Sequence, residues 1–96
     1  MTNIKGERLI TINAQYGETY CIQYESDYFV NILNQTDGVI SVSPTAAYYE
    51  DENYSNCMKL IENAFYYDFC SKLNHTLFIS STGDGYITIV RTDGRR

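Results

Sequence analysis

Hydrophobic and polar residues alternate along the first half of the chain. Apolar side chains recur at every second position over residues 10–14, and again over residues 20–24 after a short break that contains a glycine. A period of two on both sides of such a break predicts a β-hairpin. A second hairpin is predicted over residues 28–33 and 39–43, because Asp37-Gly38 supplies the positive φ angles of a tight turn.

The pattern changes after Pro44, the one proline of the chain. At a helical period, Cys57, Met58, Ile61, Ala64 and Phe65 fall within a stripe of about 120°. This spacing predicts an amphipathic helix that begins at about Glu52 or Asn53 and ends at about Asn74. Such a helix would bury its apolar stripe against one face of the sheet.

Two further strands are predicted over residues 76–80 and 86–91, which are rich in β-branched and aromatic side chains and flank a loop with two glycines. The element order is then ββββαββ. This order predicts an α+β fold with an antiparallel sheet of about six strands, either strongly twisted or split in two, and one helix across it. We expect one domain over residues 1–96, with a frayed tail at 92–96.

Composition supports a folded domain and narrows its function. Hydrophobic residues make up 44% of the 96 residues and charged residues 20%, which is not the composition of a disordered chain. Twelve acids against seven bases leave a net charge of −5, which excludes a basic nucleic-acid binder. No apolar run approaches the roughly 20 residues of a transmembrane helix. The first residues lack the apolar segment of a secretory signal, so we expect a cytoplasmic protein.

The sequence contains no recognisable metal or cofactor motif. Its three cysteines show no C-x-x-C spacing, and neither glycine-rich phosphate-binding pattern occurs. The acidic run Glu50-Asp51-Glu52 lacks the alternating ligands and central glycine of a calcium loop. Consecutive acids also suit the first turn of a helix, where the dipole favours them. We therefore expect no metal and no cofactor.

One cysteine and the sole histidine raise the question of catalysis. Cys70 lies on the polar face of the predicted helix, and His75 follows the helix end. A thiol enzyme could use them as nucleophile and base. A histidine near a helix C-terminus also interacts well with the dipole, which requires no catalysis, and this structural interpretation is the one we favour.

The distribution of charge suggests a binding surface. Residues 16–68 contain nine acids and a single base, together with nine of the ten tyrosines. Tyrosine is enriched at protein interfaces, and carboxylates at a rim steer a domain toward a basic partner. In the alternative interpretation, the acids have no role beyond keeping the domain soluble, and the tyrosines fill its core. The predicted partner-binding residues are the charge contacts Glu50, Asp51 and Glu52 with the anchors Tyr48, Tyr49 and Tyr54, and a second patch of Glu25 and Asp27.

In size, acidity, tyrosine content and lack of catalytic residues, the chain resembles the small inhibitors carried by phages and mobile elements, such as anti-CRISPR proteins and DNA mimics. Toxin-immunity proteins share this composition because they also cap basic surfaces. The resemblance implies a non-enzymatic protein that blocks a basic, nucleic-acid-handling surface of another protein or complex, without itself binding nucleic acid or membrane. A self-associating structural subunit is the alternative, in which Ile87, Ile89 and Val90 would lie on a sheet edge that pairs with a second copy.

Overall fold

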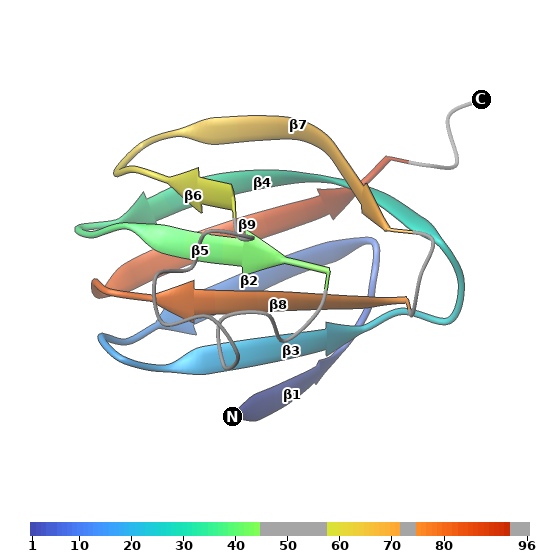
Figure 1. Cartoon of the computed structure of the whole chain (residues 1–96), viewed down its shortest axis with the longest axis horizontal. Helices are drawn as coiled ribbons and strands as arrows, with labels where there is room; N and C mark the ends of the chain where they lie inside the picture. Colours follow the sequence, from blue (N-terminus) through green and yellow to red (C-terminus); the bar gives the residue numbers. More distant parts are fainter. Residues whose placement is uncertain (45–57, 72–74, 93–96) are drawn as a thin grey trace.

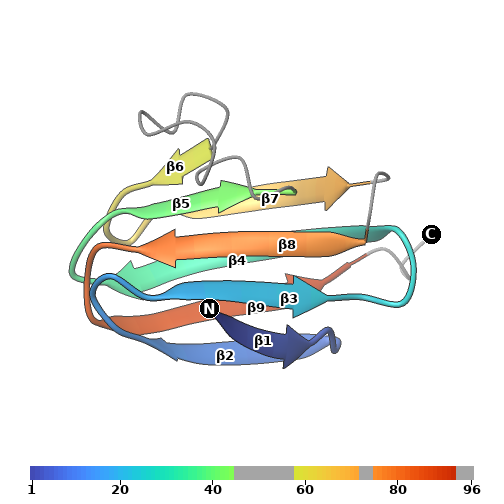
Figure 2. The same ribbon diagram turned by 60° about the horizontal axis from the view of Figure 1, so that its bottom comes forward.

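Two β-sheets lie face to face in the computed structural model (Figure 1), which describes residues 1–44, 58–71 and 75–92, with the backbone alone for residues 67–71. Sheet A contains, in spatial order, β1 (Thr2–Lys5), β3 (Thr19–Gln23), β8 (Thr76–Ser81), β5 (Ile40–Ser43) and β6 (Met58–Leu60). Sheet B contains β2 (Leu9–Ala14), β9 (Gly85–Arg91), β4 (Tyr28–Thr36) and β7 (Phe65–Ser71). Figure 2 shows the two layers after a rotation.

From β2 to β9, the first strand pairs with the last, the second with the second-last, and so on toward the middle of the chain. β2 pairs with β9, β3 with β8, β4 with β7 and β5 with β6, each pair antiparallel. Eight strands paired in this way and wrapped into two sheets make a jelly roll. β1 extends sheet A by pairing in parallel with β3. Consecutive strands from β2 to β5 and from β6 to β9 therefore lie in opposite sheets.

The core lies between the sheets and follows directly from the alternation in the sequence. In β4, every second residue from Tyr28 to Thr36 is buried, and the residues between them are not. The same alternation buries Ile10 and Ile12 of β2. Isoleucine, valine, leucine and tyrosine side chains from both sheets form one cluster, as expected for two sheets that pack about 10 Å apart.

The predicted α+β fold is wrong, because the described part of the chain contains nine strands and no helix. Residues 58–60 and 65–71, predicted as helix, form β6 and β7. The turn between them places Asn63 at a φ of 64°, a conformation that asparagine tolerates and a helix does not contain. Its N–H donates to the backbone oxygen of Asn34. The aromatic run Phe65-Tyr66-Tyr67 then favours a strand.

The six predicted strands are confirmed, but the hairpins are wrong. β2 and β3, predicted to pair with each other, lie in different sheets, and so do β4 and β5 and also β8 and β9. A period of two shows which face of a strand is buried. It does not show whether the next strand lies beside it or across the core, so the pairing could not be derived from the pattern.

The predicted edge near the C-terminus is also wrong. β9 lies between β2 and β4, and its Ile87 and Ile89 are fully buried in the core. Self-association cannot use that strand as an edge. No helix in the described residues is long and apolar enough to span a membrane.

Candidate functional site

One end of the sandwich is formed by four turns, each of which crosses from one sheet to the other. They gather on the left of Figure 1. The turns cover residues 15–18, 37–39, 61–64 and 82–84, and each carries one exposed acidic side chain and no Lys or Arg. We call these four turns the acidic end; its carboxylates are Glu18, Asp37, Glu62 and Asp84.

Hydrogen bonds from backbone N–H groups, mostly to side-chain oxygens, join the turns to one another. Oδ1 of Asp37 accepts a hydrogen bond from the N–H of Asp84 at 2.8 Å, and the N–H of Asp37 donates to the carbonyl oxygen of Asp84 at 3.0 Å. Oδ1 of Asp84 in turn accepts from the N–H of Tyr16 at 2.9 Å. Thr82 and Val39 add a further pair, in which the Val39 N–H donates to Oγ1 of Thr82 at 2.9 Å. Three of the four turns are thus held as a unit.

A buried amide connects the fourth turn to this unit. The Asn34 side chain is fully buried, and its Nδ2 donates to the carbonyl oxygens of Leu60 and Ile61 at 2.9 and 3.0 Å. The same nitrogen lies 2.9 Å from the carbonyl oxygen of Gly38. Its Oδ1 accepts from both the N–H and the hydroxyl of Thr36. Asn34 therefore fixes the turn that carries Glu62 against the turn that carries Asp37.

Two apolar side chains are exposed beside these carboxylates. Tyr16 is 75% exposed and belongs to the turn of Glu18, and Ile61 is 67% exposed and precedes Glu62. Carboxylates at the surface repel one another within a Debye length of about 8 Å at physiological salt. A rigid acidic end with exposed apolar side chains is suited to a basic protein surface, which would relieve that repulsion and cover the apolar groups.

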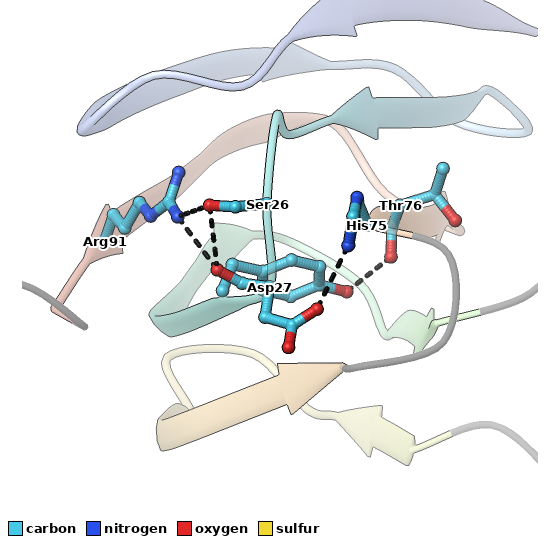
Figure 3. Close-up of polar contacts among 6 residues, drawn as sticks. Ser26, Asp27, His75, Thr76 and Arg91 are labelled. Carbon is cyan, nitrogen blue, oxygen red and sulfur yellow. Dashed lines mark hydrogen bonds and ion pairs between the residues drawn. The ribbon is translucent and has the colours of Figure 1, made fainter.

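The opposite end of the sandwich has a different electrostatic character. Nε2 of His75 lies 3.0 Å from Oδ1 of Asp27, and both side chains are about half exposed (Figure 3). An Nη atom of Arg91 donates to Oγ of Ser26 at 2.8 Å and to the backbone oxygen of Asp27 at 2.9 Å. Asp27 thus lies beside a histidine and a guanidinium.

Aromatic packing positions these polar groups. The Arg91 guanidinium lies over the ring of Tyr24, 5.2 Å from its centroid, and the Tyr24 ring lies 4.7 Å from that of Tyr28. The Tyr28 hydroxyl donates to the backbone oxygen of Thr76. The N–H of Tyr24 donates to the backbone oxygen of His75. These contacts anchor the connection between β3 and β4 that carries Asp27.

The sequence-predicted site residues fall into two groups. The first group lies outside the described residues: Tyr48, Tyr49, Glu50, Asp51, Glu52 and Tyr54. Of the second group, Glu25 is exposed and Asp27 pairs with His75. Their use by a partner stays a prediction. The expectation that Tyr20, Tyr24 and Tyr28 belong to the core is confirmed, since all three are buried.

The thiol-enzyme hypothesis placed Cys70 and His75 on and after a helix, and that helix is not present in the described part of the chain. Cys70 lies in strand β7, where its backbone is opposite Phe29, and not on the polar face of a helix. His75 has a φ of 60° and follows a strand, so the helix dipole does not explain its position. The contact of its side chain with Asp27 explains that position instead.

The acids at positions 18, 37 and 62 are visible in the sequence, but their gathering at one end is not. Each acid of the acidic end lies in or beside a turn between two alternating segments, and that signal was present in the sequence. Their assembly at one end requires the jelly-roll pairing, which the alternation does not determine. No protein-family model, no curated protein and no solved structure matches the chain.

Proposed function

We propose that this protein is a non-enzymatic, cytoplasmic binding protein that blocks a basic, nucleic-acid-handling surface of another protein or complex. It acts in the manner of the anti-defence inhibitors of phages, such as anti-CRISPR proteins or DNA mimics. The proposal assigns it no cofactor and no direct contact with nucleic acid.

The acidic end is the observation that carries this proposal. Four exposed carboxylates lie on four different turns, and hydrogen bonds through Asp37, Asp84 and Asn34 join those turns. A surface that is ordered before binding loses less conformational entropy when the partner docks. Exposed Tyr16 and Ile61 supply apolar contact area within a rim of negative charge, which is the usual composition of an interface core and its edge.

The test is affinity capture from a bacterial lysate with a charge-reversed variant and a matched control. Glu18→Lys/Glu62→Lys changes the net charge from −5 to −1, because each substitution adds two positive charges. It leaves Asp37 and Asp84 to hold the turns. Thr2→Lys/Asn3→Lys/Glu7→Lys reaches the same −1 with exposed residues of the N-terminal segment. We expect wild type and control to retain one nucleic-acid-binding complex, and the acidic-end variant to lose it.

Two further measurements define the contact. Raising the salt concentration should weaken capture, because exposed charge pairs are screened, and duplex DNA should displace the protein from its partner. Retention of the same complex by the acidic-end variant would contradict the proposal. A captured toxin would identify an immunity protein, and a captured defence complex an inhibitor. A separate variant, Glu50→Lys/Asp51→Lys/Glu52→Lys, tests the sequence-predicted site, which is wrong if this variant binds like wild type.

A further inference from the structure

The outer face of sheet B is uncharged throughout its described side chains. Outward-facing residues alternate with the buried residues of β2, β4 and β9, and Phe65 begins β7 beside them. In register they form three rows across the sheet: Leu9–Val90–Asn31, Thr11–Thr88–Leu33–Phe65 and Asn13–Tyr86–Gln35. We call these ten residues the neutral face. The chain carries a net charge of −5, yet none of the ten is acidic or basic.

Large apolar side chains are exposed on the neutral face. Leu9 is 61% exposed, Tyr86 is 53% exposed and Val90 is 37% exposed, although each belongs to a regular strand. The other members of their two rows are the carboxamides Asn31, Asn13 and Gln35, and the row between them contains two threonines; these side chains donate and accept hydrogen bonds without bringing a charge. Contiguous exposed apolar surface with a polar surround marks interaction sites on soluble proteins.

We propose that the neutral face is the interface of a homodimer, in which two copies pack this face of sheet B against each other. Copies of an acidic protein repel one another wherever carboxylates face carboxylates. The described part of the neutral face has none, so it allows close approach of two like-charged chains. A basic partner gains nothing from this face and would be attracted to the acidic end instead. The neutral face of a second copy carries the apolar and amide groups that match it.

Symmetry and area fit a reversible dimer. A twofold axis through the centre of the sheet, near Thr88, would make the interface isologous, with the same residues contributed by both copies. Four strands about 4.8 Å apart and about six residues long give a footprint of roughly 400 Å² per copy. Stable interfaces bury about 800 Å² per partner, so this dimer should be weak and concentration-dependent.

The test is sedimentation of the full chain over a dilution series from about 1 µM to about 1 mM, which covers the range of weak dimers. Val90→Lys places an ammonium group on the neutral face and should raise the dimer dissociation constant at least tenfold. Ile61→Lys is the matched control, because it makes the same kind of change at an exposed apolar residue of the acidic end. It should leave the dissociation constant unchanged.

Two additional measurements keep the inference falsifiable. If Val90→Lys is less stable than wild type in thermal unfolding, Thr88→Lys and Thr88→Glu provide an independent pair. Each should be monomeric alone, and the two together should form a heterodimer.

Salt should strengthen the homodimer, because it screens repulsion between acidic copies, whereas salt should weaken capture of a basic partner. A wild type that stays monomeric at 1 mM, or a dimer unaffected by Val90→Lys and Thr88→Lys, would overturn the inference. Neither outcome bears on the proposed function.

Discussion

At the acidic end the carboxylates of Asp37 and Asp84 accept hydrogen bonds from backbone N–H groups, whereas at the opposite end the carboxylate of Asp27 pairs with His75. Backbone N–H groups orient a carboxylate and leave its charge in place. A nearby guanidinium, such as that of Arg91, offsets part of this charge. The same residue type therefore stabilises turns at both ends, but the four turns of the acidic end carry no Lys or Arg, whereas Arg91 lies beside Asp27 at the opposite end.

The two ends also differ in what makes them rigid. The acidic end depends on a buried polar residue, Asn34, and on close backbone contacts between turns. The opposite end depends on aromatic rings under a guanidinium, with Arg91 over Tyr24. A buried hydrogen-bonded amide is costly to remove, because its partners stay buried, whereas exposed polar contacts can be replaced by water. Substitutions should therefore affect stability more strongly at the acidic end.

Asn34→Ala should have the largest effect. The substitution removes the side-chain donor to the carbonyl oxygens of Leu60, Ile61 and Gly38 and the acceptor for the buried Thr36, and it opens a small cavity, at a cost of about 2–4 kcal/mol. Urea unfolding would measure this loss. The control Asn13→Ala removes an exposed amide and should cost less than about 0.5 kcal/mol. Equal effects of the two substitutions would show that Asn34 does not hold the turns.

Gly83→Ala should be next, and it tests the close approach of two turns. A Cβ at this position would lie 2.4 Å from the backbone nitrogen of Gly38 and 2.5 Å from Oδ1 of Asp37. Overlap with backbone atoms forces the turns apart, at a cost of about 1–3 kcal/mol in unfolding free energy.

The comparison glycine for this test is Gly17. It has a φ of 83° with nothing near a Cβ, so Gly17→Ala carries only conformational strain, about 1 kcal/mol. The Gly83 variant should also bind the basic partner less well, because it displaces Asp37. If Gly17→Ala destabilises the protein as much as Gly83→Ala, turn packing is not the determinant of rigidity.

How much of this architecture the sequence reveals can be judged from particular residues. The alternation over residues 10–14 and 28–33 predicted buried strands correctly, because a period of two follows directly from strand geometry. Over residues 57–65, the apolar side chains have a helical spacing by chance, and the predicted helix is wrong. Asn63 instead forms a turn, and its N–H donates to the backbone oxygen of Asn34, 29 positions earlier in the chain. Such contacts are absent from a local pattern.

The acidic end could not be predicted without knowing which strands lie side by side in the fold. Asp37 and Asp84 are 47 positions apart and meet because β4 ends where β9 begins in sheet B. The sequence shows that residues 16–68 are acidic. The consecutive acids at 50–52 were predicted as the binding site because adjacent charges are visible in a sequence, whereas charges that folding brings together are not.

Arg91→Met tests the opposite end and should have an intermediate effect. Methionine keeps an apolar stem but removes the hydrogen bonds to Ser26 and Asp27 and the contact with the Tyr24 ring. We expect a loss of about 1–2 kcal/mol in denaturant unfolding. Arg8→Met, at an exposed arginine, is the matched control and should stay within about 0.5 kcal/mol of wild type. Capture of the basic partner should be unchanged in both variants, since neither alters the acidic end.

His75→Asn should have the smallest effect, because the ion pair with Asp27 is half exposed to water. Asparagine is chosen because it tolerates the φ of 60° at this position, so the backbone conformation is kept. A double-mutant cycle with Asp27→Asn, measured by urea unfolding, should give a coupling energy below about 1 kcal/mol. Asp27→Asn should weaken partner capture far less than Glu18→Lys/Glu62→Lys, because the Asp27 side chain already pairs with His75 and Arg91 lies beside it. A coupling above about 2 kcal/mol, or capture lost on neutralising Asp27 alone, would reverse the assignment of the two ends.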